Sequence, residues 1–211
     1  MARRNRKGKK KVVIITVIAV ILVIGVIMVM RIMNSSNNDI SPLTRAGDQR
    51  QTGRRLEVSF SYDKVRMIAT SQFAFWIEDM NGNYIHTLYA TNYTAQGGYR
   101  RRPQSISQWV SAANPAGMHP SEIDTISGAT PAPGDYIVYW NFSDRNGNLV
   151  ADTQYRFFID ATMNFDDNAM YSGIITIGDE AWTYSPLLEY TVQNSRYKNM
   201  ITNVRLAYYS N

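Results

Sequence analysis

Residues 132–161 read APGDYIVYWNFSDRNGNLVADTQYRFFIDA, and this stretch predicts the fold most directly. Its arms, residues 136–142 and 154–160, are rich in Tyr, Phe, Trp, Ile and Val, the residue types that favour strands. Between them lies Asp144-Arg145-Asn146-Gly147-Asn148. Asn-Gly supplies the positive φ angles of a hairpin turn, and the Asp can bond its own backbone. The stretch therefore predicts two strands joined by a hairpin turn.

Strand-like segments recur on both sides of this stretch. In Leu56–Tyr62 apolar and polar residues alternate, as in a half-buried strand. Further segments rich in aromatic and β-branched residues and bounded by turn residues are Gln72–Glu78, Tyr84–Thr91, Tyr171–Ile177, Leu187–Gln193 and Ile201–Tyr209. No amphipathic helix of normal length is expected, although Ser105–Ala113 predicts one or two helical turns. Many short strands with tight turns indicate an all-β fold, an antiparallel β-sandwich.

A second turn repeats the chemistry of the first. Asp79-Met80-Asn81-Gly82-Asn83 also separates two aromatic-rich strands and predicts a hairpin. A calcium loop is the alternative for both turns, because D-x-N-G-N presents several oxygens. Neither turn has the spacing or the closing Glu of an EF-hand. We interpret both as hairpin turns and keep calcium as the alternative.

The N-terminal part of the chain indicates a membrane anchor. Residues 12–30, VVIITVIAVILVIGVIMVM, carry no charge and as a helix would span roughly 28 Å, close to the hydrocarbon thickness of a bilayer. Seven of the eleven residues before them are Lys or Arg, which predicts a cytoplasmic N-terminus. A cleaved signal peptide, the alternative, would have a shorter apolar stretch and a small-residue cleavage site. We therefore expect a cytoplasmic stub (1–11), a signal anchor in the lipid bilayer (12–30), a flexible polar linker (31–55) and an extracytoplasmic domain (56–211).

The net charge of +5 belongs to the basic stub. Without its seven cations the chain has 15 basic and 17 acidic residues, so nucleic acid binding loses its electrostatic basis. The chain contains no cysteine, so disulfides cannot stabilise the exported part. About 155 residues suffice for one domain that buries around two-thirds of its surface.

The hairpin stretch and its surroundings resemble a known family. Residues 132–161 are similar to a hairpin of Ig-like domains such as that of the flagellar hook-capping protein. With FAFWIEDMNGNYIHTLY, RRRPQSISQW and IDTISGAT upstream, the chain over residues 73–178 resembles the bacterial extracytoplasmic family of domain of unknown function 2271. The resemblance implies an Ig-like β-sandwich. Asp152-Thr153 replaces the Gly that this family often has before its Tyr, which indicates a divergent branch.

One motif within this resemblance implies a cofactor. Residues 124–130, DTISGAT, resemble the D-x-x-(S/T)-G-A-T signature at which a flavin transferase attaches FMN to threonine. Carried over by position, Thr130 would be the acceptor, Gly128 and Ala129 would keep the segment small, and Asp124 and Ser127 would be recognition positions. A covalent flavin would not diffuse away outside the cytoplasm and could carry electrons. A plain turn-rich loop is the alternative, because residues 131–134 read PAPG.

Other candidate sites are less specific. The two histidines, His86 and His119, lack the spacing of a metal site. Arg100-Arg101-Arg102 could meet a phosphate or a lipid head group, or form a solvated loop. Asp160, Asp166 and Asp167 are expected in a loop where calcium is an alternative. The tryptophans are interpreted as core or edge packing rather than a glycan platform; they are Trp76, Trp109, Trp140 and Trp182.

Two functions follow from these patterns. The first is a membrane-anchored accessory protein that carries FMN on Thr130, loaded by an exported FMN transferase, and passes electrons to a membrane redox partner. The second is a non-catalytic Ig-like module that binds a partner at the cell surface. No pairing of a nucleophile with a base is visible, so hydrolytic catalysis is the weaker expectation. Loss of flavin from a Thr130→Ala variant would separate the first function from the second.

Overall fold

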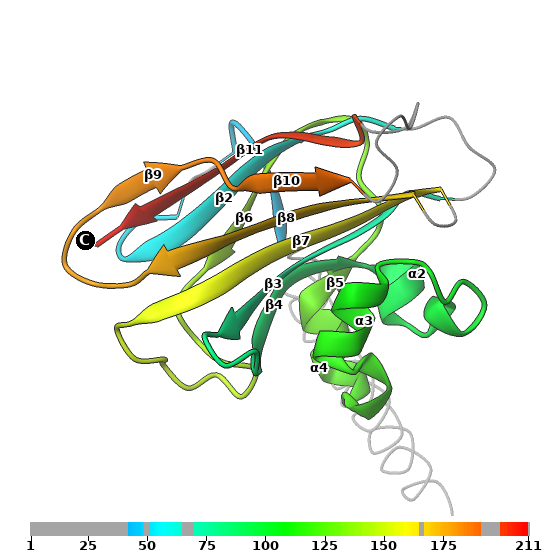
Figure 1. Cartoon of the computed structure of the whole chain (residues 1–211), viewed down its shortest axis with the longest axis horizontal. Helices are drawn as coiled ribbons and strands as arrows, with labels where there is room; N and C mark the ends of the chain where they lie inside the picture. Colours follow the sequence, from blue (N-terminus) through cyan, green and yellow to red (C-terminus); the bar gives the residue numbers. More distant parts are fainter. Residues whose placement is uncertain (1–41, 49–50, 65–69, 165–166, 191–198, 211) are drawn as a thin grey trace, which may run out of the picture. The chain divides into compact units, whose positions relative to one another are not determined.

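The computed structural model describes residues 42–48, 51–64, 70–164, 167–190 and 199–210, which form two β-sheets and a set of short helices (Figure 1). These residues lie in one compact unit that begins at Ser41. The predicted stub and anchor lie outside the described residues. Within the described ranges, no helix is long and apolar enough to cross a membrane.

Sheet A is antiparallel throughout and has strand β2 at its centre. Its order is β1 (Leu43–Arg45), β6 (Gly134–Trp140), β2 (Arg55–Tyr62), β11 (Ile201–Tyr209) and β9 (Trp182–Tyr184). The register pairs Leu56 with Trp140 and Tyr62 with Gly134. Apolar side chains of β2 are buried while Ser59 and Ser61 are partly exposed, which confirms the alternation predicted for this strand.

Sheet B lies against sheet A, and its strand β3 is covered on both faces. Its order is β10 (Leu187–Tyr190), β8 (Asp167–Thr176), β7 (Gln154–Asn164), β3 (Gln72–Asp79), β4 (Tyr84–Thr91) and β5 (Ser127–Gly128). In β3, every residue from Gln72 to Glu78 is buried. A strand with both faces covered carries a continuous apolar run, and FAFWI in β3 fits that rule.

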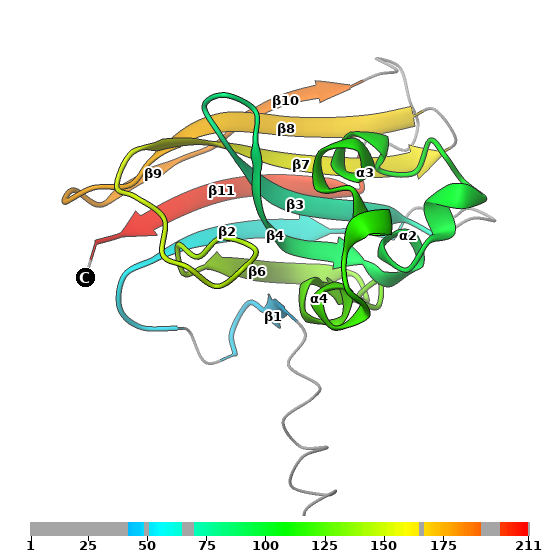
Figure 2. The same ribbon diagram turned by 90° about the horizontal axis from the view of Figure 1, so that it is seen from below.

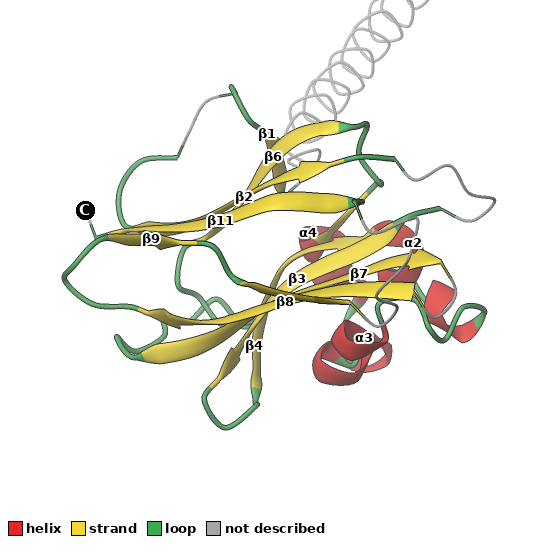
Figure 3. Ribbon diagram, turned by 45° about the horizontal axis from the view of Figure 1, so that its top comes forward, coloured by secondary structure: helices red, strands yellow, loops and turns green. Residues whose placement is uncertain are grey.

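The first core fills the space between the two sheets (Figure 3). Its centre is aromatic: the Phe60 ring of β2 lies 4.7 Å from the Phe75 ring of β3, and Phe73 lies 5.5 Å from Tyr89. Burial of each such side chain contributes about 1.5–3 kcal/mol. Trp140 belongs to this core and Trp182 packs against its edge, as predicted.

A helical insertion between β4 and β6 covers part of the outer face of sheet B, at one end of its strands (Figures 1 and 2). It comprises α2 (Asn92–Ala95), η1 (Gly98–Arg100), α3 (Ser107–Ala113), η2 (Pro115–Gly117) and α4 (Pro120–Ile126). Trp76 of β3 stacks on Phe158 of β7 at 5.0 Å, and both meet Trp109 of α3 in a second core. The prediction of one or two turns within Ser105–Ala113 is confirmed by α3, whereas α2 and α4 were not predicted.

One of the two predicted hairpins is wrong. Strands β3 and β4 form a hairpin around residues 80–83, with Glu78 paired to Tyr84. Strands β6 and β7, in contrast, lie in different sheets, so the chain crosses between sheets through residues 141–153. The Asp144–Asn148 turn is local to this connection, which is closed by one bridge between Ser143 and Leu149.

The ends of the domain also differ from the expected boundaries. Strand β1 lies within the range 31–55 that we expected to be a linker, and its residues pair with Tyr136–Val138 of β6. Strand β9 was not predicted. The expected strand Leu187–Gln193 forms β10 up to Tyr190, and residues 191–193 lie outside the described residues.

Candidate functional site

The DTISGAT motif runs from a helix into a sheet edge. Asp124 is exposed on α4, and Ser127 and Gly128 are buried in β5. Strand β5 pairs in parallel with β4, with Ser127 opposite Ala90 and Gly128 opposite Thr91. The alternative of a turn-rich loop over residues 127–134 fits residues 129–133, which have no regular secondary structure, but not Ser127 and Gly128, which form β5.

The last two motif residues leave the sheet and reach the surface. Ala129 is exposed and its carbonyl accepts a 2.8 Å hydrogen bond from the Tyr89 hydroxyl. Burial raises the pKa of Tyr89, so this hydroxyl keeps its proton and remains a donor. Thr130 is half-buried, and its Oγ1 donates to the carbonyl of Ser71 at 3.2 Å. The predicted acceptor residue is thus partly exposed, with its hydroxyl hydrogen-bonded to the backbone.

Gln72 organises the backbone on which Thr130 rests. It is fully buried, and its Nε2 donates to the Ser71 carbonyl at 2.8 Å and to Thr70 Oγ1 at 3.0 Å. Its Oε1 accepts from Thr91 Oγ1 at 2.7 Å and from the Thr94 hydroxyl at 3.0 Å and backbone N–H at 3.2 Å. A single amide therefore links the start of β3, the end of β4 and helix α2. Sequence reasoning missed it, although a Gln beside FAFWI was a signal of a buried polar group.

Ser127 is the one motif side chain whose hydroxyl lies buried in the domain. Its Oγ has no hydrogen-bond partner among the described residues. A buried hydroxyl without a partner costs about 1–3 kcal/mol, so the Ser127 hydroxyl does not stabilise the fold.

One arginine of the Arg100–Arg102 run also contacts the backbone beside Ser71. Arg102 Nη1 donates to the carbonyl of Thr70 at 3.0 Å, one residue before the carbonyl that Thr130 uses. Arg100 lies over the Tyr99 ring at 5.6 Å. Arg102 and Thr130 thus contact adjacent residues of one segment, although they are far apart in the sequence.

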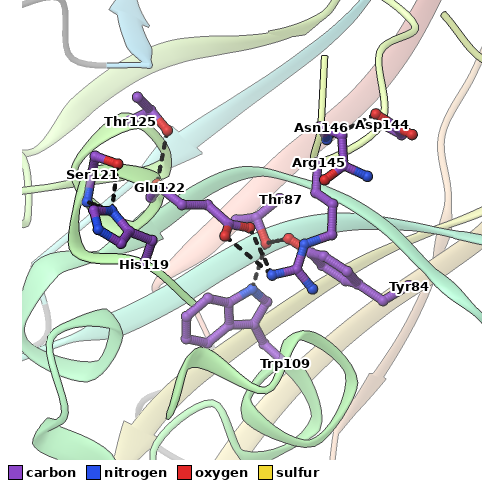
Figure 4. Close-up of polar contacts among 10 residues, drawn as sticks. All are labelled: Tyr84, Thr87, Trp109, His119, Ser121, Glu122, Thr125, Asp144, Arg145 and Asn146. Atoms are coloured by element: carbon purple, nitrogen blue, oxygen red, sulfur yellow. Dashed lines mark hydrogen bonds and ion pairs between the residues drawn. The ribbon is translucent and has the colours of Figure 1, made fainter. Parts of the chain in front are cut away.

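Helix α4 is braced against β4 and the residue 141–153 connection (Figure 4). Glu122 forms a 3.0 Å ion pair with Arg145, whose guanidinium lies 5.7 Å from the Tyr84 ring. Tyr84 and Trp109 both hydrogen-bond the Thr87 hydroxyl at 2.8 Å. Burial raises the pKa of Tyr84 to about 12. These contacts fix the helix from which the motif emerges.

An open groove with a volume of about 330 Å³ lies beside α4. Helix α4 lines it with Ile123 and Asp124, and the segments around α2, η1 and η2 contribute Tyr99, Arg100 and Met118 among others. This volume is at the lower end for sites that hold small molecules. Asp124, the first residue of the motif, therefore lines this groove.

The two histidines serve different elements. His86 is half-buried in β4, and burial lowers its pKa. The His119 Nδ1 contacts the Ser121 hydroxyl at 2.8 Å and caps α4. No cluster of three or more His, Cys, Asp or Glu side chains occurs in the part of the chain that the structure describes.

Asp160 is not in a loop, which corrects our expectation. It is fully buried in β7, and its Oδ2 accepts the backbone N–H of Gln108 at 3.0 Å. Burial raises the pKa of Asp160 to about 7 despite this hydrogen bond. Asp167 begins β8, and Asp166 lies outside the described residues.

The aspartates of the two tight turns are engaged by their own loops. Asp79 Oδ1 accepts the backbone N–H groups of Asn81 and Asn83, each at 2.8 Å. Asp144 repeats this geometry with Asn146 and Asn148. Hydrogen bonds from Asn83 lower the pKa of Asp79, and those from Asn148 lower the pKa of Asp144. Both carboxylates therefore accept hydrogen bonds within their own turns.

Fold and site together define a strand-rich domain of two sheets with a helical cover and a surface threonine at one sheet edge. The chain belongs to the family described as "Predicted periplasmic protein (DUF2271)", whose model matches residues 54–184. The matched range spans β2 to β9 and includes the whole motif. Neither the curated proteins nor the solved structures gave a match. Membership in this family supports an extracytoplasmic location.

Proposed function

We propose that this protein is a membrane-anchored extracytoplasmic electron carrier with FMN attached covalently to Thr130. The observation that carries the proposal is the placement of the motif: Thr130 and Ala129 reach the surface at the end of β5, and Asp124 is exposed on α4. A transferase can contact all three without unfolding the core. Residues 12–30 would hold the domain at the membrane, near a redox partner.

The attachment reaction has a simple balance. Thr130 Oγ1 forms a bond to the FMN phosphorus of a flavin dinucleotide, and the bond from that phosphorus to the nucleotide monophosphate breaks. The hydroxyl proton passes to a base of the exported transferase. No electrons are transferred in this step. Asp124 would be contacted where it is exposed on α4, and Ala129 would let the transferase approach closely. Ser127 and Gly128 are buried in β5, so the transferase would read them only once β5 separates from β4.

We also propose that the two sheets form an Ig-like sandwich, and the strand order supports this. Ig-like sandwiches place strands B and E side by side in one sheet and C and F in the other. Here β2 pairs with β6, β3 pairs with β7, and both β2–β3 and β6–β7 cross between sheets. In this correspondence β11 occupies the position of strand A, although it comes from the C-terminal end.

Co-expression with an FMN transferase tests the proposal. The full chain should gain the mass of FMN less one water and fluoresce in a denaturing gel, and Thr130→Ala should abolish both. Thr125→Ala is the matched control, because Thr125 is an exposed threonine whose Oγ1 bonds only the Glu122 carbonyl of its own helix. Wild-type protein that stays colourless beside an active transferase would refute the proposal.

A binding module at the cell surface is the second candidate. The groove at Tyr99, Met118 and Asp124 favours it, because a concave surface with apolar and charged walls suits a small ligand. Thr130 does not line the groove, so ligand binding there would not require this residue. An unflavinylated wild type would therefore make this candidate the leading function.

A further inference from the structure

We propose that helix α3 is a pH-sensitive cover on sheet B, held closed by the protonated carboxyl group of Asp160 and hinged at Ile106 and Asn114. The helix lies over strands β7 and β3 on the outer face of the sheet (Figure 2). The proposal goes beyond the proposed function and is independent of flavin attachment to Thr130.

Two side chains of β7 hold the start of the helix. Asp160 Oδ2 accepts the backbone N–H of Gln108 at 3.0 Å, and Thr162 Oγ1 accepts the backbone N–H of Ile106 at 2.6 Å. Strand β7 itself is paired along its length with β3 on one side and β8 on the other. The strand is therefore fixed by two ladders, whereas α3 is attached to it through side chains. Of the two, the helix is the part that can move.

Both ends of α3 have a left-handed backbone conformation. Ile106, directly before the helix, has φ 41°, and Asn114, directly after it, has φ 48°. Asn adopts this conformation readily, but a β-branched residue is strained in it. Ile106 is fully buried in the second core, so packing holds it in the strained conformation. Release of the helix would relieve this strain, and the two residues are the places where the backbone would turn.

Asp160 provides the trigger because burial affects its two protonation states differently. Its side chain is fully buried, and burial raises its pKa to about 7, although the backbones of Gln108 and Trp109 hydrogen-bond it. When the helix is released and water reaches the carboxyl group, its pKa returns towards the ordinary 3.8. The closed state is therefore favoured at low pH and loses this advantage as the pH rises from about 4 to 7. Each pH unit in that window raises the ratio of released to closed protein about tenfold, roughly a thousandfold in all, and the response is level above pH 7.

The surroundings of Asp160 leave this response to its own carboxyl group. Helix α3 reads SQWVSAA and carries no charge, and the residues paired with Asp160 are Ala74 and Met170. Asn168 Nδ2 donates to Asp160 Oδ1 at 3.3 Å. Charged groups on the neighbouring segments are Glu78 of β3, Arg156 of β7, Asp167 of β8, Glu189 of β10 and Arg102 before α3. None of these charges contributes to the raised pKa of Asp160, which arises from burial.

Release of α3 would also change the groove beside α4. Pro115 follows the hinge residue Asn114 directly and lines the groove together with Ala116 and Met118. Met118 packs in the same core as Trp109 of α3, so the groove wall and the helix share their support. A small ligand of the groove would therefore bind more tightly at acidic pH, when this wall is in place.

Amide hydrogen exchange of the full chain tests the cover. Exchange is followed by mass spectrometry from pH 5 to pH 8, and each rate is divided by the rate of an unprotected amide at the same pH. In wild type, protection of residues 107–114 should fall about a hundredfold over this range, all of it below about pH 7. Amides of the ladder between β3 and β7 should keep their protection.

Two variants separate the trigger from the attachment. Asp160→Asn keeps an acceptor for the Gln108 N–H but cannot ionise, so its protection of residues 107–114 should not change with pH. Thr162→Val is the matched control, because it removes the acceptor of the Ile106 N–H without removing a titratable group. It should lower protection about tenfold at every pH and leave the hundredfold pH response unchanged.

Each outcome decides for or against the cover. An equal pH response in wild type and Asp160→Asn refutes it, and so does an equal loss of protection in the ladder between β3 and β7, because the domain then opens as a whole. If Asp160→Asn does not fold, the profiles of wild type and Thr162→Val decide. A change of about tenfold per pH unit that levels off above pH 7 supports the cover, and a flat profile or one that still rises above pH 7 refutes it.

Discussion

Replacement of Gln72 by Met should destabilise the domain severely although it barely changes the volume of the side chain. The amide is fully buried, and Met offers no donor and only the weak acceptor of its thioether sulfur. The Thr94 backbone N–H and the Thr91 hydroxyl both donate to Gln72 Oε1 and would lose that acceptor. The Thr94 hydroxyl can turn to Ser105 Oγ, which already lies 3.0 Å away.

The magnitude follows from these two orphaned donors. Each buried donor left without an acceptor costs about 1–3 kcal/mol, so Gln72→Met should lower the free energy of unfolding by about 2–6 kcal/mol. Urea unfolding of the full chain, followed by tryptophan fluorescence, measures this change. Gln104→Met is the matched control: its side chain is exposed, and we expect a change within about 0.5 kcal/mol. A Gln72→Met variant within about 1 kcal/mol of wild type would refute the role of this amide.

Three further predictions concern charge and the motif. The pKa of Asp160 is about 7 in the fold against 3.8 ordinarily, so its favourable contribution is complete below about pH 4 and is lost as the pH rises through 7. Asp160→Asn should therefore flatten the stability profile by up to about 4 kcal/mol between pH 4 and 8, measured by urea unfolding; an unchanged slope would contradict this. A double-mutant cycle on Glu122 and Arg145 should give a coupling energy of about 0.5–1 kcal/mol, since both groups are partly exposed; additive effects would show that the pair does not brace α4. Ser127→Ala should leave the melting temperature equal or higher, yet reduce flavin loading; unimpaired loading would remove Ser127 from recognition.

Local patterns predicted most of the sheet strands. Alternation in Leu56–Tyr62 and the aromatic composition of Gln72–Glu78 identified β2 and β3 because each strand's own burial determines its residue types. Short strands such as β1 and β5 have too few residues to show the two-residue alternation of a strand. They form because each pairs with the edge of a longer strand, β6 and β4 respectively. The helices of the insertion have four to seven residues, less than two full turns, so no 3.6-residue period emerged.

The sheet crossing between β6 and β7 was mispredicted for an identifiable reason. Turn chemistry at Asp144–Asn148 is the same as at the true hairpin Asp79–Asn83, down to the hydrogen bonds of each Asp. Turn residues specify a local reversal of the chain and not the pairing of the strands beyond it. Connection length differs: residues 141–153 separate β6 from β7, far more than a tight hairpin needs. That length was the signal for a crossing.

The candidate site combines one part that sequence motifs can reveal with another that they cannot. Residues 124–130 are contiguous, so their resemblance to a flavin attachment signature suffices to suggest Thr130 as an acceptor. Arg102 and Gln72 reach Thr130 only through the carbonyls of Thr70 and Ser71, and carbonyls leave no trace in a sequence pattern. The motif thus marks where a flavin would be attached. The connection of Arg102 and Gln72 to this segment depends on how the start of β3 lies between the insertion and β5, and this part of the site follows from the fold alone.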